Sequence, residues 1–251
     1  MDVVILAGGG GTRLREMTEF MPKALIPIGG RPILYHIMKI YAHHGHTDFI
    51  LALGYKQEAF KEYFNHFDDI NNDCVIHVGR YRGTTCRESP DNWKVTLSDT
   101  GINSDKSARL RMIEKYIKGD TFMVTYGDGI ADIKINALLA YHESKGRIAT
   151  VTGIHPQARF GEIHHDDGLV TSFSEKPHDG QLVNGGFFVF NREIFKYLEG
   201  DLETHVLEKL TQIGQLAVYQ HDGYWGCLDT IKDMDDLNRL WDSGKAKWRV
   251  W

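Results

Sequence analysis

The chain has 251 residues, of which 42% are hydrophobic and 25% charged, and its formal net charge is −5. This composition is ordinary for a soluble globular protein, and the lack of a basic surplus argues against a nucleic-acid partner. No apolar run approaches the roughly 20 residues that cross a bilayer, and the N-terminus has no signal-peptide layout, so we expect no membrane partner and a cytoplasmic location. Without an internal repeat or a low-complexity linker, we predict a single domain over residues 1–251.

The first predicted element is an apolar strand that leads directly into a glycine loop. Residues 3–7 are apolar and rich in β-branched side chains, as buried parallel strands are. The glycines that follow can take positive φ and turn their N–H groups toward an anion. Arg13 adds a cationic fork that suits phosphate oxygens. We therefore predict that a polyphosphate lies against Leu6, Ala7, Gly8, Gly9, Gly10, Gly11, Thr12 and Arg13.

Two better-known glycine loops are excluded by the spacing of this one. A Walker-type loop needs a second glycine followed by Lys and Ser or Thr, but Arg13 stands where the glycine should be. A dinucleotide-binding fingerprint needs a glycine where Arg13 or Leu14 stands. The remaining alternative is that the glycines only form a mobile turn.

Strand and helix patterns alternate through the first half of the chain. Helix-like stretches cover residues 31–45, 57–64 and 106–118, and strand-like stretches cover residues 48–53, 75–78, 93–97 and 121–125. Strand signals dominate later, at residues 149–154, 169–173 and 183–190. The alternation predicts an α/β fold with a mixed, mostly parallel central sheet and helices on both faces, and the later strands predict an extension of that sheet.

A carboxylate follows the buried strand predicted at residues 121–125. Asp128 stands between two glycines at the carboxyl end of that strand, where open α/β sheets bind ligands. A side chain so placed is free of bulk and can reach a hydrated Mg²⁺ ion. The alternative is an aspartate that caps a helix beginning near Ala131.

The motifs in combination resemble those of a known family. The glycine loop followed by Pro22-Lys23-Ala24-Leu25 resembles the signature of sugar-phosphate nucleotidyltransferases, the nucleoside-diphosphate-sugar pyrophosphorylases. Further stretches resemble the glucose-1-phosphate cytidylyltransferases of that family, at residues 32–39, 93–101, 159–161, 184–188 and 240–248. The similarity runs nearly end to end in the same order, and it implies a Rossmann-like nucleotidyltransferase fold. The chain departs from the pattern at Gly10, Met21, Ala24 and Cys227.

This resemblance implies which residues bind the nucleotide and act in catalysis. The expected catalytic residues neutralise phosphate charge, and they are Arg13, Lys23 and Lys176. The glycine loop, Arg13 and Lys23 would hold the triphosphate. A second segment would line the base and the triphosphate, through Thr100, Gly101, Ser104 and Arg109.

The resemblance also implies a sugar site and a metal site. The expected sugar-binding residues are Tyr126, Glu175, Lys176 and Asn184. Mg²⁺ is the expected cofactor, held by Asp128 and Asp229, which stand far apart in the sequence. A single ion bound by distant carboxylates fits the chain better than a local D-x-D clamp, because no such pair is present at Asp128.

The implied reaction joins CMP from CTP to a sugar 1-phosphate, with α-D-glucose 1-phosphate as the expected acceptor. The products are pyrophosphate and a CDP-sugar for cell-surface polysaccharide synthesis. No protein nucleophile is required, because a phosphate monoester with a second pKa of about 6 is mostly ionised near neutral pH. Three alternatives stay open: a cytidylyltransferase with a different phosphorylated acceptor, a nucleotide-sugar-binding glycosyltransferase, and a catalytically silent regulatory subunit. The intact G-G-x-G-T-R loop disfavours the glycosyltransferase, and the retained aspartates and phosphate-binding cations disfavour the silent subunit.

The sequence also allows expectations about the cysteines and the oligomeric state. Cys74, Cys86 and Cys227 form an odd, scattered set without C-x-x-C spacing, so we expect free thiols in a reducing cytoplasm. We also expect the chain to form a homo-oligomer.

Overall fold

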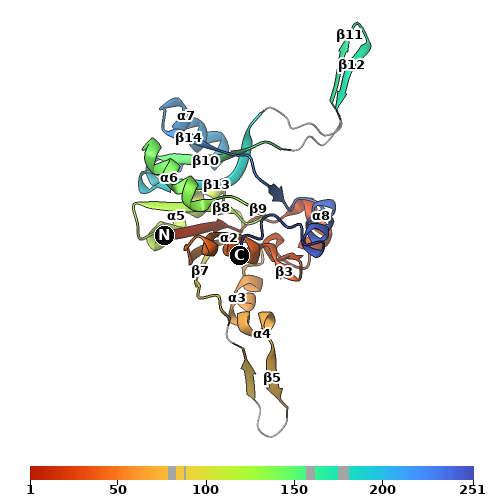
Figure 1. Cartoon of the computed structure of the whole chain (residues 1–251). Coiled ribbons are helices and arrows are strands. Elements are labelled where there is room, and N and C mark those ends of the chain that lie inside the picture. Colours follow the sequence, from red (N-terminus) through yellow and green to blue (C-terminus); the bar gives the residue numbers. More distant parts are fainter. Residues whose placement is uncertain (79–82, 88, 157–161, 175–180) are drawn as a thin grey trace.

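The computed structural model describes residues 1–78, 83–87, 89–156, 162–174 and 181–251. A seven-stranded sheet lies at its centre, in the strand order β14-β10-β13-β8-β1-β4-β7 (Figure 1). β13 runs antiparallel to both of its neighbours, and every other neighbouring pair in the sheet is parallel. Along the chain, the strands of this sheet are β1 (Asp2–Leu6), β4 (Asp48–Leu53), β7 (Lys94–Asp99), β8 (Thr121–Tyr126), β10 (Ala149–Ile154), β13 (Val183–Asn191) and β14 (Leu216–His221).

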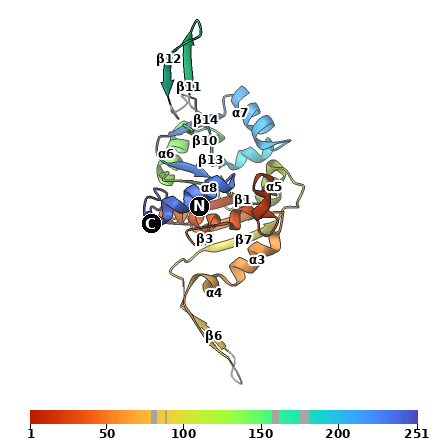
Figure 2. The same ribbon diagram turned by 90° about the vertical axis from the view of Figure 1, so that its right-hand side faces the viewer.

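Helices cover both faces of the sheet, because the side chains of β1 alternate between two hydrophobic cores. Val3 and Ile5 face one core, and Val4 faces the other. On the first face the core includes α2 (Ile33–His43), α6 (Ile135–Lys145) and α8 (Ile231–Asp242), and on the second face it includes α5 (Lys106–Ile113) and α7 (Glu208–Gln212) (Figure 2). The predicted mixed, mostly parallel sheet with helices on both faces is therefore confirmed.

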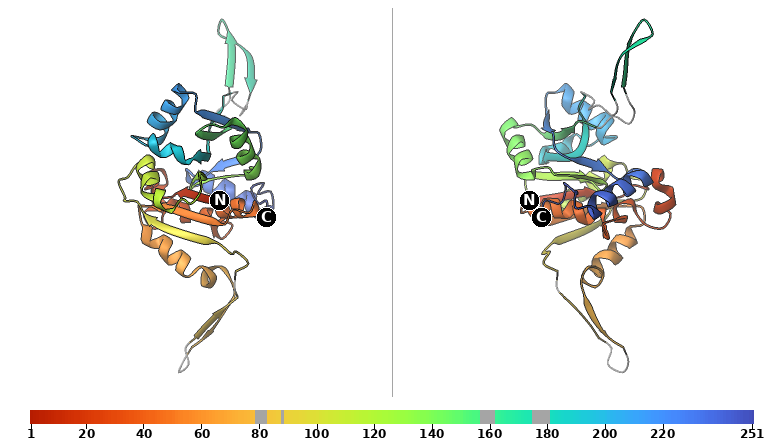
Figure 3. Two further views of the ribbon diagram at one scale, coloured as in Figure 1. Left: turned by 90° about the vertical axis from the view of Figure 1, so that its left-hand side faces the viewer. Right: turned by 45° about the vertical axis from the view of Figure 1, so that its right-hand side comes forward.

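The remaining elements are helical segments and two-stranded pairs. The helical ones are α1 (Arg15–Thr18), α3 (Gln57–Asn65), α4 (Phe67–Asn71), η1 (Thr12–Leu14), η2 (Lys23–Leu25), η3 (Glu114–Tyr116), η4 (Arg192–Lys196) and η5 (Leu202–Leu207). Among the described residues, four two-stranded pairs stand outside the main sheet: β2 (Pro27–Ile28) with β3 (Arg31–Pro32), β5 (Cys74–His77) with β6 (Gly83–Cys86), β9 (Gly129–Ala131) with β15 (Trp225–Cys227), and β11 (Glu162–Asp166) with β12 (Leu169–Ser174). The β5–β6 and β11–β12 hairpins stand away from the sheet (Figure 3).

Several predicted elements differ from the structure. The strand predicted at residues 75–78 corresponds to β5, which pairs with β6 in a hairpin outside the central sheet. Residues 31–32 form β3, and α2 begins only at Ile33, because Pro32 is extended and serves as its N-cap. The helix predicted to reach residue 118 ends at Ile113 and continues only as the 3₁₀ turn η3. The predicted strand at residues 169–173 does not extend the central sheet, since β12 pairs with β11 in a separate hairpin.

The prediction of free thiols is wrong for two of the three cysteines. The register of the β5–β6 hairpin places Cys74 opposite Cys86, and the two form a disulfide with their Cα atoms 4.0 Å apart. Spacing along the sequence did not reveal this pair, because it exists only once the hairpin sets its register. Cys227 is a free thiol, as predicted.

No helix in the described part of the chain is long and apolar enough to cross a membrane.

Candidate active site

The glycine loop leaves the middle of the sheet, where three parallel strands end together. Ala7, just beyond β1, donates its N–H to the carbonyl of Ala52 near the end of β4, at 3.1 Å. On the other side, Gly127 N–H donates to the carbonyl of Leu6 at 3.2 Å. The loop and the segment that carries Asp128 therefore start from adjacent strands at one edge of the sheet. Open α/β sheets bind ligands at this edge.

The inner half of the loop is packed against a buried arginine. The Arg109 guanidinium donates to the carbonyls of Gly8 and Leu53, at 3.1 and 3.0 Å. A Cβ at Gly8 would lie 2.1 Å from Nη1 of Arg109, and a Cβ at Gly54 would lie 2.6 Å from it. The chain can approach this guanidinium so closely only because both positions are glycine. Burial lowers the pKa of Arg109, although Asp105 and Asp99 partly oppose that effect.

The segment predicted to line the base meets the same arginine. Thr100 is fully buried, and its hydroxyl donates to the Leu53 carbonyl at 2.6 Å while accepting from Arg109 at 2.7 Å. Gly101 has a φ of +78°, and its N–H donates to Asp99 at 2.9 Å. Ser104 is half-buried, and its hydroxyl lies 3.1 Å from where a Cβ of Gly101 would stand. Arg109 is thus bonded to the glycine loop and Thr100 to β4, whereas Gly101 and Ser104 lie nearer the surface.

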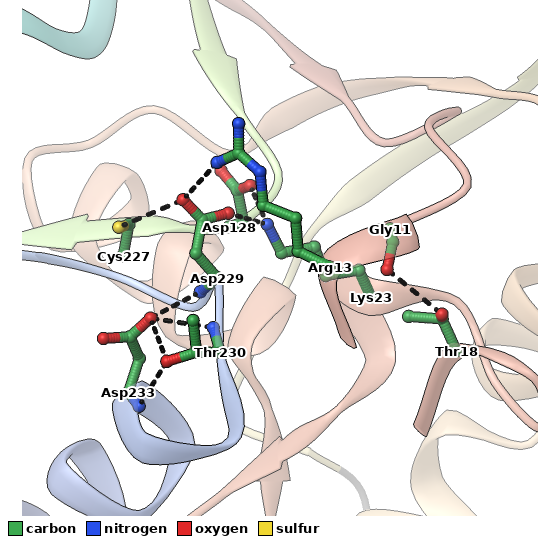
Figure 4. A network of polar contacts seen from close by, with 9 residues as sticks. All are labelled: Gly11, Arg13, Thr18, Lys23, Asp128, Cys227, Asp229, Thr230 and Asp233. Atoms are coloured by element: carbon green, nitrogen blue, oxygen red, sulfur yellow. Dashed lines mark hydrogen bonds and ion pairs between the residues drawn. The ribbon is translucent and has the colours of Figure 1, made fainter. Parts of the chain in front are cut away.

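The outer half of the loop is open. Gly9 and Gly10 are exposed, and a Cβ at either would find no atom within 4 Å. Gly11 turns the chain with a φ of +59°, and its carbonyl accepts from the Thr18 hydroxyl at 3.1 Å (Figure 4). Thr12 is exposed, and the side chain of Arg13 is 74% exposed. A large anion can therefore approach this half of the loop without moving a side chain.

Four of the predicted residues form one charged cluster beside the outer half (Figure 4). The Lys23 ammonium lies 2.6 Å from Oδ2 of Asp128 and 2.6 Å from Oδ1 of Asp229. Arg13 Nη1 lies 3.2 Å from the other oxygen of Asp229. Burial lowers the pKa of Lys23, but the two carboxylates outweigh it, so the pKa lies above its ordinary value and Lys23 is protonated at neutral pH.

A small ladder brings the two aspartates together across the sequence. β9 and β15 pair antiparallel, with Gly129 opposite Cys227. Asp128 immediately precedes β9 and Asp229 comes shortly after β15, so this pairing brings the two aspartates close together. Leu228 N–H donates to the Asp128 carbonyl at 2.9 Å, which closes the ladder. This contact places both carboxylates on the same side of the loop.

The backbone at Asp229 is further fixed by the start of α8. Thr230 is the N-cap of that helix and forms a capping box with Asp233, whose carboxylate also accepts from Asp229 N–H at 3.1 Å. The pattern Thr-x-x-Asp is a recognisable signal for such a cap. This sequence pattern could therefore have indicated that the start of a helix fixes the backbone at Asp229.

Cys227 lies beside the cluster. Its sulfur is 3.9 Å from Oδ2 of Asp229. Burial and the charge of Asp229 raise the pKa of the Cys227 thiol to about 12. Because the thiolate is the reactive form, the raised pKa disfavours Cys227 as a nucleophile.

A second polar cluster surrounds Tyr126 at the end of β8. The Tyr126 hydroxyl donates to Glu203 and accepts from Asn184 Nδ2, the latter at 3.1 Å. Lys106 pairs with Glu203 and lies 5.0 Å from the centre of the Tyr126 ring. Burial and the Glu203 carboxylate raise the pKa of Tyr126 above its ordinary value. Glycine at position 186, with a φ of +81°, leaves room for the ring.

Sequence reasoning missed Glu203 and Lys106 in this second cluster. Glu203 lies in η5, a π-helical turn, and Lys106 begins α5, so neither follows a recognisable motif. One oxygen of Glu203, Oε2, is buried without a hydrogen-bond partner among the described residues. Of the other predicted sugar-binding residues, Glu175 and Lys176 lie outside the described residues.

The donor set of the charged cluster fits a hard divalent cation. Two carboxylates from separate elements converge on one cationic group, and Mg²⁺ prefers carboxylate oxygen ligands. Lys23 holds both carboxylates close together despite their like charge. Asp128 and Asp229 are the residues that would bind the ion.

Comparisons with known proteins find similar sequences along nearly the whole chain. The sequence model of the family described as "Nucleotidyl transferase" matches residues 2–242. The chain is 42% identical to a protein of Bacillus subtilis named "Probable glucose-1-phosphate cytidylyltransferase" and 43% identical to the "Glucose-1-phosphate cytidylyltransferase" of Salmonella typhi, each over the full length of both chains.

Solved structures with a similar fold are more distant in sequence. A putative glucose-1-phosphate thymidylyltransferase from Bacillus anthracis superposes with a TM-score of 0.70 at 20% identity, covering 96% of this chain and 94% of that one. HddC from Yersinia pseudotuberculosis, solved with GMP-PN, gives a TM-score of 0.69 at 23% identity, covering 96% and 99%. At this identity the likeness shows the shared fold alone.

Proposed function

The chain belongs to the nucleotidyl transferase family, and from this premise we propose that it joins CMP from CTP to a sugar 1-phosphate, with α-D-glucose 1-phosphate as the preferred acceptor. The products are a CDP-sugar and pyrophosphate. The observation that carries the proposal is the convergence of Arg13, Lys23, Asp128 and Asp229 beside the open half of the glycine loop. The 42–43% sequence identity to named glucose-1-phosphate cytidylyltransferases, over the full length of both chains, supports the choice of substrates.

The reaction proceeds by in-line displacement at the α-phosphorus of CTP. An ionised oxygen of the sugar 1-phosphate forms the new P–O bond, and the bond to the bridging oxygen of the β-phosphate breaks as pyrophosphate leaves. The main obstacle is the repulsion between two anions. Arg13 and Lys23 reduce it by placing positive charge beside the exposed glycines, so catalysis here is positioning and electrostatics.

We propose that Asp128 and Asp229 hold one Mg²⁺ ion during the reaction. When bound, the ion neutralises phosphate charge and fixes the triphosphate for displacement. Lys23 supports this site from the protein side, because its ammonium keeps the two carboxylates together. For Lys23 also to contact a phosphate of the nucleotide, as expected, its ammonium must leave one of the two carboxylates.

The cluster around Tyr126 supports a sugar site at the end of β8. Glu203 Oε2 is a buried acceptor without a partner among the described residues, and such a group costs about 1–3 kcal/mol until it accepts a hydrogen bond. A sugar hydroxyl would supply that bond. Asn184 and Tyr126 would face the same ligand, and Glu175 and Lys176 are proposed beside them from their sequence motif alone.

Pyrophosphate release tests the proposed function. The purified protein is incubated with CTP, Mg²⁺ and a panel of acceptors that includes glucose 1-phosphate, other sugar 1-phosphates and phosphorylated polyols. We expect the highest rate with glucose 1-phosphate. A faster rate with another acceptor would favour the alternative substrate class, and CTP-independent glycosyl transfer from a CDP-sugar would favour a glycosyltransferase.

We further propose that CTP is preferred over UTP and dTTP. CTP carries an amine where UTP carries a carbonyl. A site built for CTP therefore places a hydrogen-bond acceptor opposite that amine, and the carbonyl of UTP would face it as a second acceptor. Such a mismatch costs roughly 1–3 kcal/mol, or about one to two decades in selectivity. Polar groups near Gly101 and Ser104 are the candidates for this contact. Side-by-side rates at equal nucleotide concentration test it, and equal rates with CTP and UTP would contradict it.

We also propose that the chain acts as a single domain within a homo-oligomer in the cytoplasm. The β5–β6 and β11–β12 hairpins carry exposed apolar residues, including Val75, Ile76, Leu169 and Val170. A two-stranded hairpin is at best marginally stable alone, and a second copy would cover these side chains. Light scattering tests the assembly, and a mass of 28.6 kDa in solution would contradict it.

A further inference from the structure

Two cysteines and a carboxylate face one another where the β5–β6 hairpin meets α4. Oδ1 of Asp69, which lies in α4, is 2.9 Å from Sγ of Cys86. One ligand atom from each of Asp69, Cys74 and Cys86 lies within 4.8 Å of the other two. None of these residues takes part in the proposed active site.

The surroundings of the two sulfurs are rich in oxygen. Besides the Asp69 carboxylate, the carbonyls of Asn72 and Asp69 lie 3.6 and 3.9 Å from Cys74 Sγ. A sulfur in a disulfide has no proton to donate, so these oxygens face another acceptor when the pair is oxidised. A cation held by the sulfurs would make the same contacts attractive. A reducing compartment keeps cysteines as thiols, and the deprotonated thiol is the form that binds metals.

Asp69 is oriented by a neighbour that leaves one oxygen available. Its Oδ2 lies 3.3 Å from Nδ1 of His66, one turn earlier in the chain. Its Oδ1 points at the sulfur of Cys86. Metal-binding side chains are commonly fixed in this way by an outer hydrogen bond. The arrangement therefore contains both a ligand and the group that positions it.

We propose that Asp69, Cys74 and Cys86 form a binding site for a thiolate-preferring divalent cation, Zn²⁺ above all, when the disulfide is reduced. A dithiol or phosphine reductant supplies the two electrons that break the S–S bond, and each sulfur takes up a proton. Binding of the ion then forms two sulfur–metal bonds and releases both protons. Two sulfurs and one oxygen leave a fourth tetrahedral position for water. Mg²⁺ does not compete well, because it prefers oxygen ligands.

Cobalt absorption tests the site without reference to catalysis. The whole chain is reduced with a phosphine, freed of excess reductant under anaerobic conditions, and titrated with Co²⁺. We expect one equivalent to produce a thiolate-to-cobalt charge-transfer band, which Zn²⁺ then abolishes by displacement. The oxidised chain is expected to show no band, because the disulfide occupies both sulfurs. A reduced chain without the band, or a pair that the phosphine cannot reduce, would overturn the proposal.

Matched variants separate this site from other metal-binding groups. Cys74→Ser and Cys86→Ser are expected to lose the band, whereas Cys227→Ser keeps it because that thiol stands alone beside Asp229. His66→Ala is expected to weaken Zn²⁺ binding by about 10–100-fold through the loss of an outer hydrogen bond. Asp69→Asn should weaken it too, while Asp73→Asn, an exposed carboxylate next to Cys74, should not. A band that survives in Cys74→Ser would also overturn the proposal.

Discussion

Gly8 and Gly10 stand two residues apart in one glycine run, yet their surroundings differ. A Cβ at Gly8 would lie 2.1 Å from the Arg109 guanidinium, whereas a Cβ at Gly10 would meet no atom within 4 Å. The inner half of the loop is thus fixed to the protein, and the outer half is left open beside Arg13 and Lys23. The first glycine therefore packs against the protein, whereas Gly9 and Gly10 leave the loop open for a ligand to approach.

The largest expected effect concerns the carboxylates of the outer half. Asp128→Asn and Asp229→Asn should each reduce turnover by about a thousandfold or more, because an amide supplies no negative charge to a hard cation. Thermal unfolding should change little, since Asn keeps the shape of Asp. Initial rates over a series of Mg²⁺ concentrations measure the effect, with Asp235→Asn in α8 as the control. Full rates for either variant at low Mg²⁺ would show that other residues bind the metal.

The cations of the outer half come next. Arg13→Ala and Lys23→Ala should each lower turnover by about 10²–10³-fold, the usual cost of removing one preorganised charge partner. The exposed Arg15, close to Arg13 in the chain, offers a matched control, because Arg15→Ala removes the same charge away from the cluster. Pyrophosphate release is the measurement. Near wild-type rates for Arg13→Ala would remove that residue from the proposed phosphate contacts.

The different surroundings of Gly8 and Gly10 can be tested by measuring the free energy of unfolding of variants at each position. Gly8→Ala should lower the free energy of unfolding by about 3 kcal/mol or more, because Arg109 must move and loses its hydrogen bonds. Gly10→Ala should change it by less than about 0.5 kcal/mol, as for an ordinary surface substitution. Urea unfolding of both variants measures the difference. Equal losses would mean that the inner half is not more tightly packed than the outer half.

A smaller loss of stability than that of Gly8→Ala is expected from changing the arginine itself. Arg109→Lys keeps the charge but cannot reach the Gly8, Leu53 and Thr100 oxygens together, because an ammonium lacks the planar fork. We expect a loss of about 1.5–3 kcal/mol in the free energy of unfolding. CTP affinity, measured by titration calorimetry at a temperature where the variant stays folded, should change less. Unchanged stability with much weaker CTP binding would make Arg109 a direct ligand of the nucleotide.

Individual residues show how far the sequence predicts the site. Its motifs point to Arg13, Lys23, Asp128 and Asp229, and the folded chain brings all four together. They point to Arg109 as well, but its guanidinium is bonded to backbone carbonyls, which no spacing rule could show. Glu203 and Lys106 were missed because Glu203 meets the Tyr126 hydroxyl, and Lys106 meets Glu203, only across the fold, which leaves no periodic signal in the chain.

The sequence by itself determined the strand and helix alternation, the glycine loop and the family resemblance, because these depend on residues close together in the chain. The tertiary structure decided the contacts between distant segments. The β9–β15 ladder joins Asp128 to Asp229, and the register of a hairpin sets Cys74 opposite Cys86. The side chains of β12 are as strand-like as those of β10, yet only β10 joins the central sheet. Local patterns reveal which residues form a strand, but its partner is chosen by the packing of the whole chain.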